Sequence, residues 1–142
     1  MKPPLMIGLA LAAGAAVAWV LMSTQREVAQ PQDTEGAAMV EVTLPGSWSE
    51  GAGIGQSIFE AKCSSCHGMN AVGKEGYGPP LVHKIYEPSH HADESLQRAV
   101  ALGVRAHHWG FGDMAPVDGL TRGDVAMVIR YIRDLQRANG IE

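Results

Sequence analysis

The longest apolar stretch of this 142-residue chain lies at its N-terminus. Residues Leu5–Met22 are almost wholly apolar, and Lys2 precedes them. The apolar core of a cleavable signal peptide spans about 7–15 residues, whereas a membrane-spanning helix needs about 20. Trp19–Met22 continues the run past Ala16–Ala18, the candidate cleavage site. The pattern therefore favours a retained anchor over residues 1–22 with its N-terminus inside. A cleaved signal peptide is the alternative.

The apolar pattern disappears over residues 23–48. This stretch is polar or small, with Gln, Glu, Pro, Gly and Ala and no helical periodicity, which predicts a flexible linker. Met39–Leu44 alternates between apolar and polar residues, so it is a candidate extended segment along the surface of the domain that follows. We expect that domain to occupy residues 49–142.

Three stretches of residues 49–142 repeat apolar residues every three or four positions, which predicts three helices. The first helix is expected to begin at a cap supplied by Ser47 or Ser49 and to run into Cys63. Its apolar face is predicted to include Ile54, Ile58 and Phe59.

The second helix is predicted to open at Asp93–Ser95 and to end at Gly103, and the third to run from a Thr121 cap to Asn139–Gly140. Long glycine-rich loops separate the helices, and such loops are uncommon in a small domain unless they wrap a ligand. The sequence therefore predicts an all-α domain of three main helices. The buried stripes are expected to be Leu96, Ala99, Val100 and Leu102 in the second helix, and Val125, Val128, Ile129, Ile132 and Leu135 in the third.

The charge of the chain excludes one class of partner. The formal net charge is −4, and from Ser49 onward nine Lys and Arg stand against eleven Asp and Glu. Because no basic cluster occurs, we do not expect a nucleic-acid partner. Residues 49–142 are few for a stable core, and a bound apolar cofactor would relieve that shortage.

The stretch Cys63-Ser64-Ser65-Cys66-His67 contains the only two cysteines of the chain. The spacing C-x-x-C-H is typical of covalent haem c attachment. One helical turn presents both thiols to the two vinyl groups of the porphyrin, and His67 then lies under the ring as an iron ligand. A thioredoxin-like pair does not need the histidine, and a zinc site needs further ligands at defined spacing. A disulfide between these cysteines would close almost no loop.

Five further segments follow one another in a defined order along the domain. With the C-x-x-C-H motif they resemble a class I cytochrome c over about Gly55–Ala138. The resemblance implies a small three-helix fold wrapped around one covalent haem c, in which the last helix crosses the first near Gly55 and Phe59. The segments are Gly55-x-x-x-Phe59-x-x-x-Cys63, Gly78-Pro79-Pro80-Leu81, Leu96-x-x-x-Val100-x-x-Gly103, Gly112-Asp113-Met114-Ala115-Pro116 and Tyr131-Ile132-x-x-Leu135.

The resemblance also implies the residues that hold the haem. Cys63 and Cys66 would form the two thioether bonds, and His67 would be the proximal iron ligand. The Pro79 carbonyl would accept a hydrogen bond from the other ring nitrogen of His67. Met114 would be the distal ligand, because it alone among the seven methionines is followed by Ala-Pro in a glycine-rich loop. The alternative for such a methionine is a gap-filling place in the core.

Five further histidines lie between residues 83 and 108, and the resemblance does not account for them. The simplest interpretation is solvated loop residues, some beside the haem propionates or Trp109. The alternatives are a second metal site, for example for copper, and a pH-sensitive docking surface. A further alternative makes one of the last two the distal ligand in place of Met114. The five are His83, His90, His91, His107 and His108.

With both axial positions filled, the resemblance implies an electron carrier rather than an enzyme, without a small-molecule substrate. Electrons would pass from a membrane quinol-oxidising complex or dehydrogenase to a terminal oxidase or reductase. The anchor predicts a single-pass protein of the bacterial inner membrane with its haem domain in the periplasm, or a soluble periplasmic protein after cleavage. The alternatives are a fixed cytochrome subunit of a larger respiratory or photosynthetic complex, and a haem sensor or peroxidase-like enzyme with an open distal position.

Overall fold

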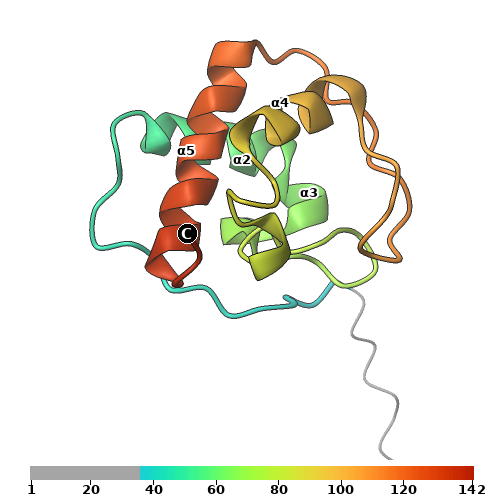
Figure 1. The fold of residues 1–142 in the computed structure, drawn as a ribbon, viewed down its shortest axis with the longest axis horizontal. Helices are drawn as coiled ribbons and strands as arrows, with labels where there is room; N and C mark the ends of the chain where they lie inside the picture. Colours follow the sequence, from blue (N-terminus) through green and yellow to red (C-terminus); the bar gives the residue numbers. More distant parts are fainter. Residues whose placement is uncertain (1–35) are drawn as a thin grey trace, which may run out of the picture. The chain divides into compact units, whose positions relative to one another are not determined.

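The described part of the chain is residues 36–142, in a computed structural model (Figure 1). The predicted membrane anchor over residues 1–22 and the predicted linker up to residue 35 lie outside the described residues. Within residues 36–142, no helix combines the length and the hydropathy that crossing a membrane requires.

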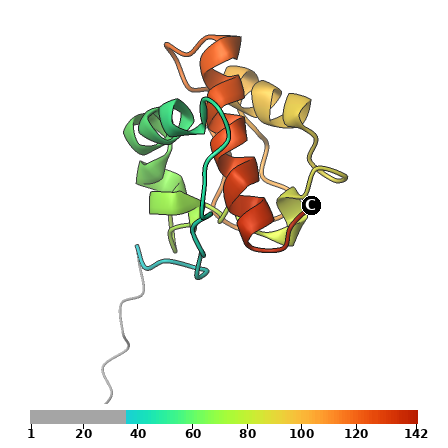
Figure 2. The same ribbon diagram turned by 90° about the vertical axis from the view of Figure 1, so that its left-hand side faces the viewer.

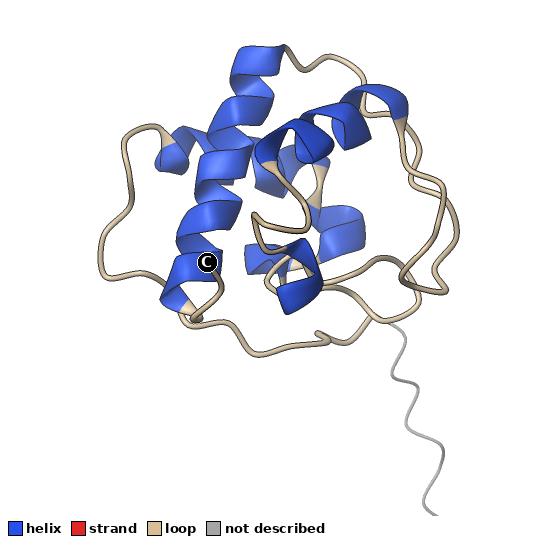
Figure 3. Ribbon diagram, viewed as in Figure 1, coloured by secondary structure: helices blue, strands red, loops and turns tan. Residues whose placement is uncertain are grey.

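Residues 36–142 form helices joined by loops and contain no strand (Figure 3). The all-α prediction and its three main helices, α2, α4 and α5, are confirmed for this part of the chain. A single turn, α3, follows α2 directly, and two short 3₁₀ turns, η1 and η2, lie in the loops after it. The bounds are α2 Ala52–Lys62, α3 Ser64–His67, η1 Met69–Ala71, η2 Lys84–Tyr86, α4 Asp93–Leu102 and α5 Arg122–Ala138.

Helices α2 and α5 cross in contact (Figure 1), and Gly55 of α2 lies against Met127 of α5. A Cβ atom at Gly55 would lie 1.9 Å from the backbone oxygen of Met127, so no side chain fits between the two backbones. One turn later, Phe59 packs against Tyr131 with ring centroids 5.5 Å apart. The predicted crossing near Gly55 and Phe59 is confirmed, and it explains why α2 contains a residue of low helix propensity at this position.

The core of the domain centres on Tyr131 in α5. Phe59, Tyr131 and Leu135 are completely buried. Trp48 also packs against Tyr131, with ring centroids 5.2 Å apart. Burial raises the pKa of Tyr131 to about 12, so its hydroxyl keeps its proton and donates to Asn70 Oδ1 at 3.1 Å. This bond ties α5 to the loop that follows α3.

Helix α5 begins with its predicted cap, whereas α2 does not. The Thr121 side chain accepts a hydrogen bond from the Asp124 backbone, and the Asp124 carboxylate accepts one from the Thr121 backbone. Helix α2 begins after Gly51, which supplies no side-chain cap. Ser49 instead donates from its backbone nitrogen and its hydroxyl to Asp134 Oδ2, at 2.8 and 2.9 Å. The serine-cap prediction is wrong because a buried carboxylate of α5 takes both Ser49 donors.

Helix α4 ends at Gly103 as predicted, but its apolar face is not fully buried. Leu102 is 71 % exposed, and Ile54, predicted on the apolar face of α2, is 61 % exposed, so both predictions of burial are wrong. The buried residue of α4 is polar: Gln97 donates to the backbone oxygen of Arg122 at 3.0 Å. Leu96, Ala99 and Val100 are half-buried because they face a cavity.

Residues 36–48, which the sequence placed in a linker, are hydrogen-bonded to the domain. The backbone nitrogens of Met39 and Val40 both lie 3.2 Å from the Val72 oxygen. Thr43 exchanges two 2.9 Å hydrogen bonds with Asn139, so the segment passes the C-terminal end of α5 (Figure 2). These residues therefore belong to the domain, although they form no strand.

Candidate functional site

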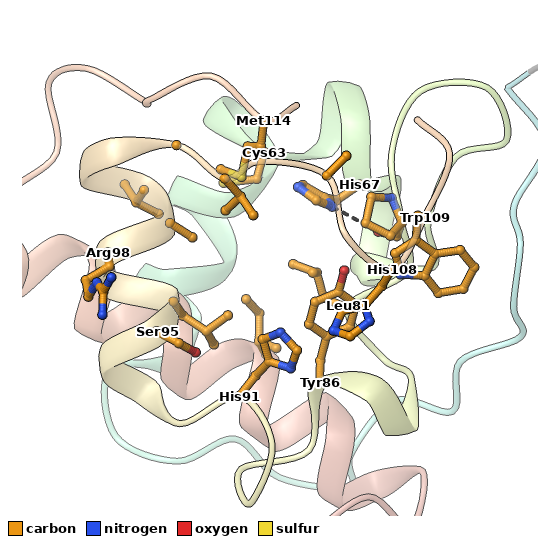
Figure 4. Close-up of a pocket in the computed structure, with 18 of the residues that line it drawn as sticks. Cys63, His67, Leu81, Tyr86, His91, Ser95, Arg98, His108, Trp109 and Met114 are labelled. Atoms are coloured by element: carbon orange, nitrogen blue, oxygen red, sulfur yellow. Dashed lines mark hydrogen bonds between the residues drawn. The ribbon is translucent and has the colours of Figure 1, made fainter. Parts of the chain in front are cut away.

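A cavity of about 630 Å³ lies between the helices and is lined mainly by apolar side chains (Figure 4). This volume is typical of a ligand or cofactor site. Side chains fill the interior of an ordinary domain and leave few voids larger than a water molecule, so a cavity of this size indicates a bound apolar group. The apolar residues that α2, α4 and α5 contribute to its walls are Phe59, Leu96, Ala99, Val100, Leu102, Val125, Val128, Ile129 and Ile132.

The cysteine pair lies where α2 ends and α3 begins. The Cys63 nitrogen donates to Phe59, and the Cys63 oxygen accepts from the His67 nitrogen at 2.9 Å. Cys63 is half-buried and lines the cavity, whereas Cys66 is exposed. Burial raises the pKa of Cys63 to about 11, and the neighbouring Cys66 adds to the shift. Both are free thiols, the form that can add to a vinyl group.

The His67 imidazole lines the same cavity, and a backbone carbonyl sets its orientation (Figure 4). His67 Nδ1 lies 2.9 Å from the Pro79 oxygen. When Nδ1 donates to a carbonyl, Nε2 keeps the lone pair that a metal requires. Burial lowers the pKa of His67, although the bond to Pro79 opposes this shift, so the ring is neutral near pH 7.

Met114 reaches the cavity from the long loop between α4 and α5. The loop begins at Gly103, whose φ of +75° favours glycine, and a Cβ atom there would lie 2.4 Å from the Met114 oxygen. Val104 then exchanges two backbone hydrogen bonds with Met114, each 2.9 Å long. Met114 therefore lines the cavity together with Cys63 and His67 (Figure 4). The fold brings three predicted site residues, from two distant segments, to one cavity.

The other methionines of residues 36–142 do not line this cavity. Met69 is 52 % exposed. Met127 lies on α5, with its sulfur 3.8 Å from Nη1 of Arg130. Met39 lies beside Val72, on the segment that precedes α2. Among the described residues, Met114 is thus the one thioether available to a group in the cavity.

Trp109 contributes a buried polar atom that the sequence analysis did not assign to the site. Its indole ring lines the cavity, and its Nε1 is buried without a hydrogen-bond partner within residues 36–142. Leaving a buried donor unpaired costs about 1–3 kcal/mol, so an acceptor on the bound group would stabilise the site. The carboxylates of a haem are such acceptors. In the sequence, the position of Trp109 directly after two histidines in a glycine-rich loop could have indicated that it belongs to the site.

Four of the five additional histidines gather at the rim of the cavity. Their neighbouring ring centroids lie 4.2–6.1 Å apart. The fifth, His83, is separate: its Nδ1 accepts from the Ile85 nitrogen at 3.2 Å, and its ring packs against Trp109. Desolvation and the neighbouring imidazoles lower the pKa of the half-buried His91 and of the exposed His108. The four are His90, His91, His107 and His108.

The family model described as cytochrome c matches residues 52–136, more than half of the chain. No curated protein and no solved structure gives a match. The match extends from α2 into α5 and includes the cysteine pair, His67 and Met114. The side chains at the cavity fit haem c: the Cys63 thiol in its wall and the exposed Cys66 thiol nearby in α3 for the vinyl groups, an imidazole and a thioether for its iron, apolar walls for its ring and an indole donor for a carboxylate. The chain therefore belongs to the cytochrome c family, as a class I c-type cytochrome with covalently bound haem c.

Proposed function

We propose that this protein is a membrane-anchored carrier that moves one electron at a time between membrane complexes. Membership of the cytochrome c family makes it a haem-based electron-transfer protein. The observation that carries the finer proposal is that His67 and Met114 line one apolar cavity with Cys63. An imidazole and a thioether together can occupy both axial positions of the iron, which leaves no position for a substrate.

Five residues have defined roles in this proposal. When bound, haem c supplies an iron that takes up and releases one electron. Cys63 and Cys66 hold it through two thioether bonds, and the Pro79 carbonyl fixes the orientation of the His67 ring and increases its basicity. The neutral thioether of Met114 favours the reduced iron and so raises the reduction potential.

The proposed partners are membrane redox complexes: a quinol-oxidising complex or dehydrogenase as donor, and a terminal oxidase or reductase as acceptor. The apolar run Leu5–Met22 and the preceding Lys2 support an anchor in the bacterial inner membrane with the domain in the periplasm. Residues 36–48 are bonded to the domain, so the tether is reduced to residues 23–35. Such a segment spans at most about 45 Å, which keeps the domain close to complexes in the same membrane.

Haem attachment and ligation are tested on the exported protein. Its intact mass is expected to exceed that of the polypeptide by one haem, and acidified acetone should not extract the haem. The reduced protein is expected not to bind carbon monoxide, because Met114 occupies the distal position. Extractable haem would contradict the attachment, and carbon monoxide binding at neutral pH would favour a sensor or a peroxidase-like enzyme instead.

The anchor and the carrier role require a separate experiment. Peptide mapping of the membrane-extracted protein is expected to recover residues before Ala18, and the detergent-solubilised particle is expected to contain this chain alone. A mature start at Trp19 or later, in protein free in the periplasm, would refute the anchor. A large particle with other subunits would identify a fixed cytochrome subunit.

A further inference from the structure

Three histidines from two distant segments converge at the rim of the cavity. His90 and His91 lie between η2 and α4, and His108 lies in the loop between α4 and α5. Figure 4 shows His91 and His108 at the cavity. Their ring centroids are 4.7, 5.4 and 5.3 Å apart. Each ring offers a nitrogen within 4.8 Å of a nitrogen of the other two. Within residues 36–142, no other three His, Cys, Asp or Glu side chains come together in this way.

The separations are close to those of a metal site. A tetrahedral ion bound at 2.0–2.1 Å by each histidine needs ligand nitrogens about 3.4 Å apart, so these nitrogens must approach by at most about 1.4 Å. His90 and His108 are exposed, and the torsion that turns an imidazole ring has a broad, shallow energy profile. Side-chain rotation can therefore close the site without movement of the backbone.

His91 already has the orientation of a metal ligand. Its Nδ1 lies 2.6 Å from the Ile85 oxygen, to which it donates, so that Nε2 keeps a free lone pair. Histidines that bind metals usually donate their other ring nitrogen to a carbonyl or carboxylate in this manner. His107 shows the same arrangement, with Nδ1 2.8 Å from the Arg105 oxygen.

Both segments that supply the histidines are held in place. The Arg133 guanidinium, whose side chain is 7 % exposed, donates to the backbone oxygens of Tyr86, before the first segment, and of His91 within it. In the second segment, the Ala106 nitrogen donates to Asp113 Oδ1 at 2.8 Å. The three rings are thus presented by supported loops, so that binding requires rotation of side chains and not folding of the loops.

We infer that His90, His91 and His108 bind a divalent ion of the late first transition series, such as Zn²⁺ or Cu²⁺. Three imidazoles without a carboxylate in the group select these ions over Mg²⁺, Ca²⁺ and Mn²⁺, which prefer oxygen ligands. The fourth position is filled by water or by His107, whose ring lies 4.2 Å from that of His108. This site is distinct from the pair of axial haem ligands and does not depend on the proposed redox partners.

The same rings have one competing role, because they line the cavity and can donate hydrogen bonds to haem carboxylates. The experiment therefore uses the full-length, haem-loaded protein, purified in detergent with an affinity tag that contains no histidine. Calorimetric titration with Zn²⁺ is expected to show one ion per chain. Absorption at the zinc K-edge is expected to show three nitrogen ligands at about 2.0–2.1 Å with water in the fourth position, or four with His107 there, a signal to which iron does not contribute.

Variants connect the ion to these side chains. His90→Gln and His108→Gln are each expected to weaken Zn²⁺ binding at least tenfold, since loss of even an outer-shell partner costs about 10–100-fold. His83→Gln removes a histidine outside the cluster and is expected to bind Zn²⁺ like the parent protein. An unchanged visible spectrum in each variant shows that the haem site is intact.

Three results would overturn this inference: no Zn²⁺ binding, equal binding by the parent and the two cluster variants, or a zinc spectrum with oxygen ligands only. If Zn²⁺ fails to bind while His90→Gln and His108→Gln shift the midpoint potential of the haem, the rings serve the haem carboxylates instead.

Discussion

Met114 is the residue on which the redox properties of this protein depend most directly. Replacing Met114 by His is expected to abolish the weak sulfur-to-iron band in the far red of the oxidised protein. It is also expected to lower the midpoint potential by on the order of 0.1 V or more, within the roughly 0.8 V that axial ligands span. The reason is that imidazole stabilises Fe(III) more than a thioether does. A redox titration followed in the visible spectrum measures both changes.

Met69→Leu is the control for this substitution. Met69 is 52 % exposed and does not line the cavity, so the band and the potential are expected to stay unchanged. A band that persists in Met114→His would assign the distal ligand to another methionine. A parent protein that lacks the band would exclude a methionine ligand, with His107 and His108 examined next.

Arg133, in α5, is a second residue whose replacement is expected to have a large effect, here on the free energy of unfolding. Its buried side chain donates to Asp93, Gln136 and the backbone oxygens of Tyr86 and His91. Arg133→Met is expected to lower the free energy of unfolding by at least about 1–3 kcal/mol, the cost of leaving one buried acceptor unpaired. Guanidinium chloride titration of the haem-loaded protein measures this loss.

The matched substitution is Arg122→Met. Arg122 pairs with Glu94 at 2.7 Å, but both side chains are largely exposed, and exposed ion pairs contribute little. The unfolding midpoint is therefore expected to change little in Arg122→Met. Equal losses of unfolding free energy in the two variants would show that the buried hydrogen bonds of Arg133 stabilise the fold no more than the exposed ion pair does.

Among the elements, the crossing of α2 and α5 gives the sharpest test. Gly55→Ala places a Cβ atom 1.9 Å from the Met127 oxygen, so the helices must separate, and a loss of about 1–3 kcal/mol in unfolding free energy is expected. Gly53→Ala is the control on the same helix, because a Cβ atom there meets nothing within 4 Å. It is expected to be neutral or to stabilise α2 by up to about 1 kcal/mol. Thermal unfolding of both variants measures the difference. Equal stability of Gly55→Ala and Gly53→Ala would contradict the close contact of the two helices at Gly55.

Elements whose limits depend on nearby residues could be predicted from the sequence. The capping box at Thr121, the acidic first turn of α4 and the end of α4 at Gly103 all involve residues within one turn of each other. The haem motif and the segment around Met114 are local patterns as well, and the structure places Cys63, His67, Pro79 and Met114 on one cavity. Their roles as ligands stay predictions that the spectroscopic experiments test.

Features that depend on residues far apart in the chain could not be predicted. Ser49 bonds Asp134, 85 residues away, instead of capping α2. Gln136 has no exposed surface because its amide donates to the backbone oxygens of Leu81 and Tyr86. The periodicity of apolar residues does not reveal such partners, because polar side chains are normally assigned to the solvent-facing side of a helix.

At the scale of the whole molecule, the small net charge of the domain predicts that its association with redox partners depends only weakly on salt. From Ser49 onward the formal charge is only −2, with nine basic and eleven acidic residues, and no lysine-rich surface run occurs in the sequence. Confinement near the membrane supplies a high effective concentration, so electrostatic steering is less necessary. Turnover in native membranes is therefore expected to change little between about 10 and 300 mM salt, where the Debye length falls from about 30 Å to under 10 Å.

Oxidase- or reductase-coupled turnover across that range of ionic strength is the measurement, with the partner enzyme assayed alone on an artificial donor as the control. A steep decline in the coupled rate, with the partner unaffected, would show that docking by charge matters more than the tether.

Val104 and Met114 fix the two ends of residues 105–113 beside each other through paired backbone hydrogen bonds. The entropy of closing a loop grows only slowly with its length, so a segment with anchored ends accepts substitutions and insertions at low cost. His107 and His108 are exposed within this loop. Mutation or design can therefore give these positions new chemistry while the Met114 sulfur keeps its place. Evolution can therefore change the function of His107 and His108 while the electron-transfer site around Met114 is retained.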